Sequence, residues 1–280
     1  MSCLMVSGCQ TGAVWPFSAW PAPTPHEGGA PPETTASTTH ESRLTPSDRV
    51  QVVQLAFDVL RVEMPVDEVR HSRKVWNHVD ELRLDSDRIA RLRRNGLRVG
   101  AASSSAWAPI RAILEAGGAK MQKDQMLPQP GTPLAIEFAS IQESESFFSY
   151  DRDNRLVGKT FSEGRKIIQL DYAFHPQLGG STDLQVDFEV QNDRGEMVWE
   201  RRDGVIRQVP AFDRHVFENL AAALTLKPGE FLVLGPGDQA DNEYLIGSRF
   251  FVQSAQGDRK ETLLFVTPQP FQTSSVRRAP

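Results

Sequence analysis

The sequence predicts an α+β protein in which a small N-terminal α/β unit, with the order β-α-α-β-α, is followed by a mainly antiparallel β-sandwich or curled sheet. Two patterns predict this fold class. Residues 50–116 combine two-residue apolar alternation with helical spacings and helix stops. Residues 134–267 are short alternating apolar runs that turn residues separate. Apolar residues at 39% and charged residues at 24% fit an ordinary globular protein.

The predicted domain organisation has four parts. Residues 1–43 are a truncated signal segment and disordered Pro/Thr-rich tether, residues 44–127 a small α/β domain, residues 128–270 a β-rich domain, and residues 271–280 a disordered tail. The middle boundary follows from the Pro/Gly-rich stretch Leu127–Pro133. A chain of 280 residues suits two compact units behind a flexible leader.

The first domain begins with a strand and continues with helices. Val50–Met64 alternates apolar and polar residues, which predicts a strand that ends at Pro65. Proline is favoured at helix starts, and apolar residues then recur at near-helical spacing up to Val79, which predicts a first helix. A second helix begins at a cap, Asp85 or Ser86, and stops at Asn95-Gly96.

A short strand and a third helix complete the first domain. Leu97–Ala101 is apolar enough for a strand, and Ala108–Ala116 places Ile110, Ile113 and Leu114 on one helical face. The pair Gly117-Gly118 predicts the end of this helix.

The second domain is predicted to be built from strands. Lys227-Pro228-Gly229-Glu230 lies between two apolar runs, which predicts a hairpin. The predicted strands are Leu134–Ile141, Phe147–Tyr150, Lys166–Phe174, Asp183–Val190, Met197–Arg201, Ala223–Leu226, Phe231–Leu234, Ser248–Gln253 and Thr262–Thr267.

The N-terminal segment, residues 1–46, indicates where in the cell the protein is located. Val6-Ser7-Gly8-Cys9 resembles the lipobox of bacterial lipoproteins, which implies a lipid on Cys9 and attachment to a membrane. The stretch from Thr11 to Pro46 is rich in Pro, Thr, Ser, Gly and Ala and predicts a flexible tether. Met1–Val6 alone is short for a signal peptide. The alternative is a disordered N-terminus in which the cysteines have no role.

Composition and missing motifs argue against several activities. The only cysteines are Cys3 and Cys9, so the remainder of the chain has no thiolate nucleophile and no cysteine-bound metal. A net charge of -5 does not indicate nucleic-acid binding. Phosphate-binding loops, dinucleotide fingerprints and nucleophile elbows are absent from the sequence. We therefore expect no enzyme, no cofactor and no metal site.

Several polar groups have a functional and a structural interpretation. Glu68 and His71 have the spacing of a metal-binding helix pair, but a solvated helix face is the simpler interpretation. The run Ser103–Ser105 is suited to anion binding or, more simply, to helix capping. A hydrolase would require His175 or His215 to meet an Asp and a Ser.

A cluster of arginines is the strongest candidate for binding. The candidate binding residues are Arg91, Arg93, Arg94 and Arg98, and Arg88 precedes them. Such a cluster attracts lipid headgroups, peptidoglycan or the acidic face of a partner protein. The simpler interpretation is a solvated helix end, where the helix dipole favours cations. A second possible surface, for a glycan or a peptide, would use Trp107, Trp199 and Tyr244.

Two parts of the chain resemble known families. Leu224–Gly235 is similar to a hairpin, and Glu261–Pro268 to the final strand, of the C-terminal part of secretins, the outer-membrane pore proteins of bacterial secretion systems. Between these segments, Asp238–Gly247 lacks the Val-Pro-x-Leu-Gly-type stretch of the family. Phe57–Val62 and Asn95–Gly100 resemble uncharacterised envelope proteins of planctomycete-type bacteria.

These observations lead to one functional prediction and one alternative. The prediction is a non-enzymatic, lipid-anchored protein on the periplasmic side of the cell envelope, which contacts other envelope proteins or itself. The secretin resemblance implies a relative or accessory of secretion machinery. The alternative is a periplasmic glycan- or peptide-binding module.

Overall fold

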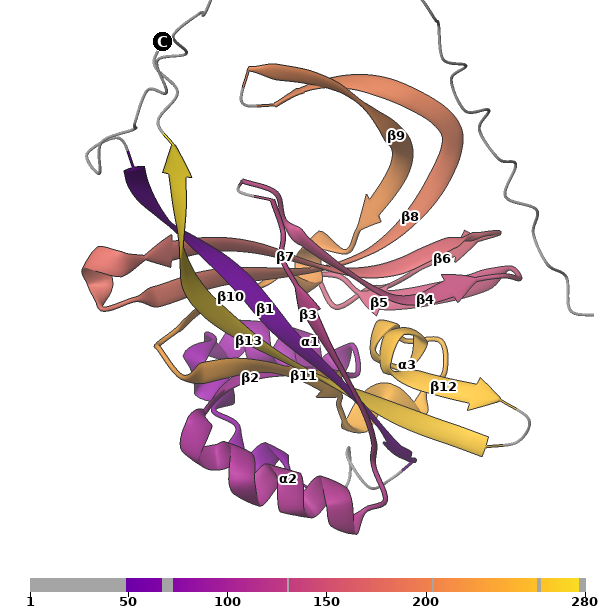
Figure 1. The fold of residues 1–280 in the computed structure, drawn as a ribbon. Helices are drawn as coiled ribbons and strands as arrows, with labels where there is room; N and C mark the ends of the chain where they lie inside the picture. The colour runs from indigo at the N-terminus through magenta and orange to yellow at the C-terminus, as the bar shows by residue number, and fades with distance from the viewer. Residues whose placement is uncertain (1–48, 67–72, 130, 203, 256–257, 277–280) are drawn as a thin grey trace, which may run out of the picture. The chain divides into compact units, whose positions relative to one another are not determined.

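The computed structural model describes residues 49–66, 73–129, 131–202, 204–255 and 258–276. They belong to one compact unit, Pro46–Pro280. The described residues form two antiparallel sheets, one small hairpin and three short α-helices, joined by loops and 3₁₀ turns (Figure 1). The predicted α+β class, dominated by curled antiparallel sheet, is confirmed.

The first sheet combines strands from both ends of the chain. β1 pairs with β13 along its whole length, and β11 lies between β13 and β2. In order the strands are β2 (Leu97–Ser103), β11 (Glu230–Pro236), β13 (Asp258–Val276), β1 (Arg49–Pro65) and β3 (Lys120–Met126), and β12 (Val252–Ala255) also pairs with β13.

The second sheet is formed by the middle of the chain. β8 is its central strand and pairs with β7 along one edge. Its other edge pairs first with β10, over Thr182–Val186, and then with β9, over Glu189–Arg202. In order the strands are β10 (Ala222–Leu226), β8 (Ser181–Arg202), β7 (Gly164–His175) and β4 (Leu134–Ile141), and β9 (Val205–Val216) pairs with β8. The separate hairpin consists of β5 (Glu145–Tyr150) and β6 (Leu156–Phe161).

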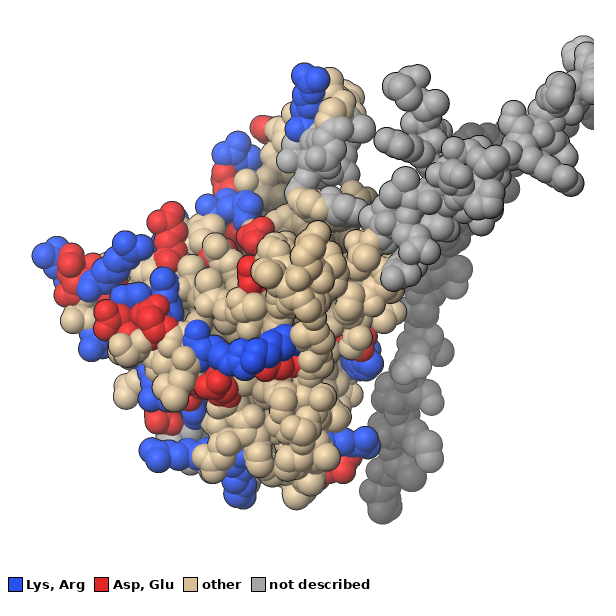
Figure 2. Space-filling view, turned by 90° about the vertical axis from the view of Figure 1, so that its left-hand side faces the viewer, with Lys and Arg blue, Asp and Glu red and all other residues tan. Residues whose placement is uncertain are grey.

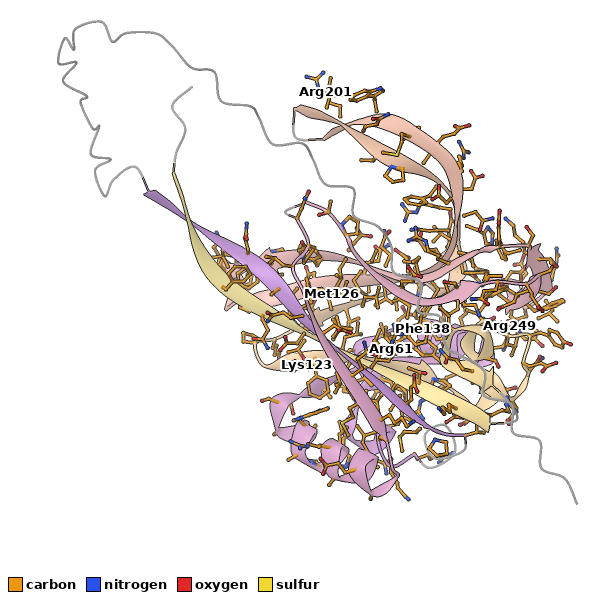
Figure 3. The ribbon with its side chains drawn as sticks, turned by 45° about the vertical axis from the view of Figure 1, so that its right-hand side comes forward. Arg61, Lys123, Met126, Phe138, Arg201 and Arg249 are labelled. Atoms are coloured by element: carbon orange, nitrogen blue, oxygen red, sulfur yellow. The ribbon has the colours of Figure 1, made fainter. Side chains whose placement is uncertain are left out.

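The two sheets share one hydrophobic core. Phe57 and Val59 of β1 belong to the same buried cluster as Ile168 and Leu170 of β7. Arg61 also joins the sheets, because its Nη2 donates a hydrogen bond of 2.7 Å to the carbonyl oxygen of Glu137. Figure 3 shows Arg61 beside Phe138, whose ring centroid is 4.8 Å from the guanidinium carbon.

The other face of the first sheet is covered by α2 (Trp107–Ala116). Ile110 and Leu114 of α2 belong to a second core cluster with Val233 and Phe265. Trp107 packs edge-on against Phe265 at 5.6 Å between ring centroids. Because β11 and β13 are buried on both faces, they have continuous apolar runs and no alternation.

The predicted boundary at residue 128 does not divide the described structure. β1 and β3, which precede it, pair with each other, and β1 also pairs with β13 near the C-terminus. The hydrogen bonds and core of the first sheet therefore need both predicted domains. β3 was not predicted, because its side chains are polar and mostly exposed at the sheet edge.

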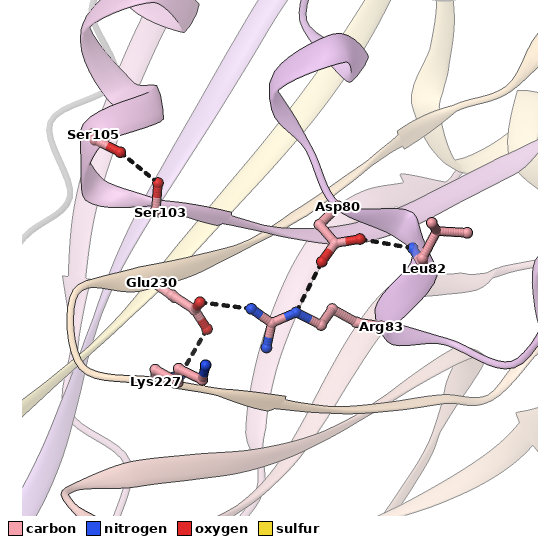
Figure 4. Close-up of polar contacts among 7 residues, drawn as sticks. All are labelled: Asp80, Leu82, Arg83, Ser103, Ser105, Lys227 and Glu230. Atoms are coloured by element: carbon pink, nitrogen blue, oxygen red, sulfur yellow. Dashed lines mark hydrogen bonds and ion pairs between the residues drawn. The ribbon is translucent and has the colours of Figure 1, made fainter.

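The predicted hairpin at Lys227–Glu230 is wrong. The turn exists, and Glu230 N–H donates to the carbonyl of Lys227 at 3.0 Å, but β10 pairs with β8 while β11 pairs with β2 and β13. The connection therefore crosses from one sheet to the other. Arg83 braces it by bonding Glu230 at 2.7 Å and Asp80 at 3.0 Å (Figure 4).

Two further element predictions are corrected. Ser248–Gln253 was predicted as a strand, but α3 (Ile246–Phe251) occupies most of it, since a short apolar run suits either element. Pro65 ends β1, and the described part of the predicted first helix is a 3₁₀ turn at Trp76–His78. The α1 helix (Ser86–Arg94) is confirmed, with Asp85 as its cap.

Candidate functional site

Three of the four predicted binding residues line one hollow. This surface hollow has a volume of about 850 Å³. We call it the arginine hollow. It is lined by Arg73, Arg93, Arg94, Arg98, Tyr150, Asn154, Asp238 and Gln239. Arg91 is not among its lining residues, and Arg88 instead donates to the carbonyl of Ala221.

The turn between α1 and β2 places these arginines together. Arg93 and Arg94 end α1, and Gly96, at φ 73°, reverses the chain in a conformation that favours glycine. In β2, Leu97 and Val99 enter the core, so the intervening Arg98 points to the opposite side. One helix end and one strand start therefore supply three guanidinium groups.

A buried carboxylate fixes two of the arginines. Oε2 of Glu81 accepts hydrogen bonds from Nη2 of Arg93 at 2.9 Å and from Nη2 of Arg98 at 2.5 Å, and Oε1 accepts from Nε of Arg98 at 3.1 Å. Burial alone would raise the pKa of Glu81, but both arginines outweigh it and hold this pKa below its ordinary value. Arg98 also stacks on Trp76, 4.3 Å from the ring centroid.

Asn95 connects the hollow to the β5–β6 hairpin. Its fully buried side chain accepts from the N–H of Tyr150 at 2.7 Å and donates to the carbonyl of Arg91 at 2.9 Å. The carbonyl of Asn95 accepts from the N–H of Gly247 at 2.9 Å. One asparagine thus holds α1, β5 and α3 in place behind the arginines.

Two arginines of the hollow are available to a ligand. Arg73 and Arg94 are exposed, and within the described ranges neither forms an ion pair. Among the described lining residues, Asp238 is the only carboxylate, against four arginines. The two unpaired guanidinium groups, beside the two that Glu81 holds, suit carboxylate or phosphate groups.

Figure 2 shows the charge on one face of the molecule. Lysine and arginine alternate there with aspartate and glutamate, without a broad area of one sign. This face therefore lacks the continuous basic stripe that is typical of nucleic-acid binding.

The histidines do not form a hydrolytic triad in the described part of the chain. Nε2 of His175 lies 2.8 Å from Asp183, and Thr225 donates its hydroxyl to the same carboxylate at 2.6 Å, so the carboxylate separates the hydroxyl from the imidazole. Burial, and then the charge of Lys159, lower the pKa of His215. No group of three metal-binding side chains is found among the described residues.

The other sequence-predicted sites are dispersed. Trp107 is packed on the first sheet, Trp199 is exposed near the end of β8 and Tyr244 contacts Phe148, so they do not share a groove. Ser103 stands at the N-cap of a 3₁₀ turn, but its hydroxyl lies 2.7 Å from that of Ser105 and forms no capping hydrogen bond (Figure 4). Cys9, Glu68 and His71 lie outside the described residues.

Comparison with solved structures finds a weak structural likeness. No protein-family model matches the sequence, and no curated protein matches it. A solved structure, the β-barrel domain of the secretin InvG from the Salmonella SPI-1 injectisome, aligns at 12% identity and a TM-score of 0.23. The alignment covers 80% of this chain and 63% of the other, and a likeness at this score carries no argument about function.

The outcome for the secretin resemblance is mixed. The predicted final strand, Glu261–Pro268, lies within β13, but β13 continues past Pro268 to Val276 and so enters the predicted disordered tail. The predicted hairpin is replaced by the crossover at residues 227–230. The resemblance to planctomycete-type envelope proteins stays a prediction. No described helix combines the length and apolar character needed to cross a membrane.

Proposed function

We propose that this chain is a non-enzymatic binding protein that holds an acidic segment of a partner protein in the arginine hollow. The observation that carries the proposal is the pair Arg73 and Arg94, which are exposed beside the fixed guanidinium of Arg98 and form no described ion pair. Carboxylates of a partner would replace water on these two side chains and meet Arg98 behind them.

Part of the arginine hollow is preorganised. Arg98 is held by Glu81 and Trp76, and the backbone behind it by Asn95, so the site is formed before a ligand arrives. Such preorganisation lowers the entropy cost of binding.

Removal of the two free arginines tests the proposal. For Arg73→Ala with Arg94→Ala, we expect the affinity for a fluorescently labelled oligoglutamate peptide to fall at least about tenfold, because two charge-assisted contacts are lost. Fluorescence anisotropy of the full chain measures it. Arg111→Ala with Lys227→Ala removes the same charge from exposed sites outside the hollow and should change the affinity less than about twofold. Equal losses of affinity in both variants would show that the peptide responds to the net charge of the chain and not to the arginine hollow.

The proposed location is the bacterial cell envelope, through a lipid on Cys9. The lipobox-like Val6–Cys9 and the following tether support it. When the gene and its upstream region are expressed in a bacterial host, we expect the wild-type chain in the membrane fraction. Cys9→Ser should move it to the soluble fraction, whereas Cys3→Ser should remain with the membranes. An unchanged distribution of Cys9→Ser would refute the anchor.

Within this proposal the partner is an envelope protein, and specifically a component of secretion machinery. The secretin-like final strand in β13 supports the second, narrower statement. Crosslinking in the membranes of the source bacterium, followed by mass spectrometry, should recover such a component with the wild-type chain and not with the Arg73→Ala, Arg94→Ala variant. Recovery of unrelated proteins alone would contradict this assignment of the partner.

A further inference from the structure

The β8–β9 hairpin extends beyond the sheet that carries it. β7 pairs with β8 as far as Arg165 opposite Gln191, whereas β8 and β9 remain paired up to Arg202 opposite Val205. We call residues 193–214, the two-stranded extension, the arm. In Figure 1 the arm curves away from the second sheet, and in Figure 3 Arg201 marks its far end.

A bulge bends the arm at its base. The β8–β9 register shifts between Asp193 and Met197, and Gly195 adopts φ 67° within the shift. Bulges of this kind increase strand twist and redirect the strand. Arg194 and Asp213 bond across the base at 2.7 Å, which holds the two strands together there.

One face of the arm carries three large apolar side chains that are open to solvent. Opposed residues of a ladder share a face, and Met197 lies opposite Pro210, Trp199 opposite Gln208, and Arg201 opposite Ile206. Met197 is 51% exposed, Trp199 71% and Ile206 62%. These three side chains therefore form one exposed apolar strip.

Three features of the arm favour association with a partner. An isolated two-stranded hairpin is marginally stable in water. Both edges of the arm past the bulge lack a neighbouring described strand, so their outward N–H and C=O groups can accept another strand. The exposed apolar strip adds surface that association would bury.

The charges of the arm point to a second copy of this chain. Residues 193–214 contain five arginines and five acidic residues, so the arm is neutral. A two-fold contact places the same surface on itself, which a neutral, mixed-sign surface permits and a surface of one sign opposes. An anionic membrane surface or a nucleic acid would favour a net positive arm.

We infer that the arm is a self-association surface, through which two copies of this chain pair by their strand edges and bury Met197, Trp199 and Ile206 between them. This inference concerns a different surface from the arginine hollow, about which it assumes nothing.

The test measures the mass of the full chain against concentration by analytical ultracentrifugation, in a Cys3→Ser, Cys9→Ser background that prevents disulfides. We expect a reversible dimer, and Trp199→Lys with Ile206→Lys should raise its Kd at least about tenfold. The matched control is Leu82→Lys with Leu178→Lys, at residues 86% and 71% exposed outside the arm, and should leave the Kd unchanged. At a concentration where the dimer forms, hydrogen exchange should show protected backbone amides in β9 for the wild-type chain and the control. The Trp199→Lys, Ile206→Lys variant should lack this protection.

Three results would overturn the inference. They are a wild-type chain that stays monomeric at all concentrations, a dimer that Trp199→Lys with Ile206→Lys leaves intact, and a monomer whose binding to phosphatidylglycerol vesicles requires Trp199. Circular dichroism establishes that each variant is folded. Unchanged oligoglutamate affinity in the arm variants would separate this test from that of the arginine hollow.

Discussion

Gly247→Ala is expected to destabilise the fold by about 3 kcal/mol or more, because the new methyl group has no space. A Cβ at this position would lie 1.8 Å from the carbonyl oxygen and 2.2 Å from the carbonyl carbon of Gly96. Both are backbone atoms, and the same Gly96 carbonyl accepts from the N–H of Gly237 at 2.8 Å. Relief of the clash would therefore separate α3 from the turn that carries the arginines.

Chemical denaturation of the two variants Gly247→Ala and Gly179→Ala measures this effect. Gly179 has φ 70° but open space around its Cβ position, so its replacement should cost only about 1 kcal/mol of backbone strain. A Gly247→Ala chain that unfolds at the same denaturant concentration as the Gly179→Ala chain would show that α3 does not pack against Gly96 as described.

Glu81→Gln is expected to lower the free energy of unfolding by about 2 to 3 kcal/mol at neutral pH, since it leaves a largely buried guanidinium without its carboxylate. The side chain of Arg98 is 12% exposed, whereas that of Arg93 is 56% exposed and contributes less. Glu115→Gln, which breaks the exposed pair with Arg111, is the matched control and should cost less than about 0.5 kcal/mol.

The effect of Glu81→Gln should depend on pH. The pKa of Glu81 is lower in the folded chain than its ordinary value, so the ionised carboxylate stabilises the fold above that ordinary value. This stabilisation is lost as the pH falls through the folded-state pKa, where the wild-type carboxyl becomes neutral like glutamine. Denaturation at neutral and at acidic pH should therefore show the difference between the two chains shrinking. A difference that is constant with pH would contradict the proposed pairing.

Local patterns were sufficient to predict most elements. Asp85 with Asn95-Gly96 predicted both ends of α1. The alternation in Leu184–Val190 predicted a strand with one buried and one solvated face; the strand is present, but Asp187 and Glu189 on the second face are buried too, and Glu189 pairs with Arg214 at 2.7 Å. Strand pairing was not predictable in the same way. Lys227–Glu230 has the chemistry of a tight turn, but turn chemistry does not specify which sheet receives the next strand. The two flanking strands differ in burial: β10 is buried at alternate residues, whereas β11 is buried almost continuously. This difference is what distinguishes the sheets to which they belong.

Only part of the candidate site was predicted, because local sequence identifies residues that are close along the chain and not those that folding brings together. Arg93, Arg94 and Arg98 are close in sequence, so a local charge count identified them. Arg73 and Glu81 were missed because tertiary structure brings them to the cluster from before α1. Arg91 was included because sequence proximity does not show which way a side chain leaves its helix.

The most direct test of the account is the affinity of the oligoglutamate peptide for the wild-type chain and for the Arg73→Ala, Arg94→Ala variant, measured side by side at low and high ionic strength. We expect saturable binding to the wild-type chain that weakens with salt, and at least about tenfold weaker binding to the variant at low salt. Equal affinities of the two chains, or no binding by the wild-type chain at low salt, would contradict it.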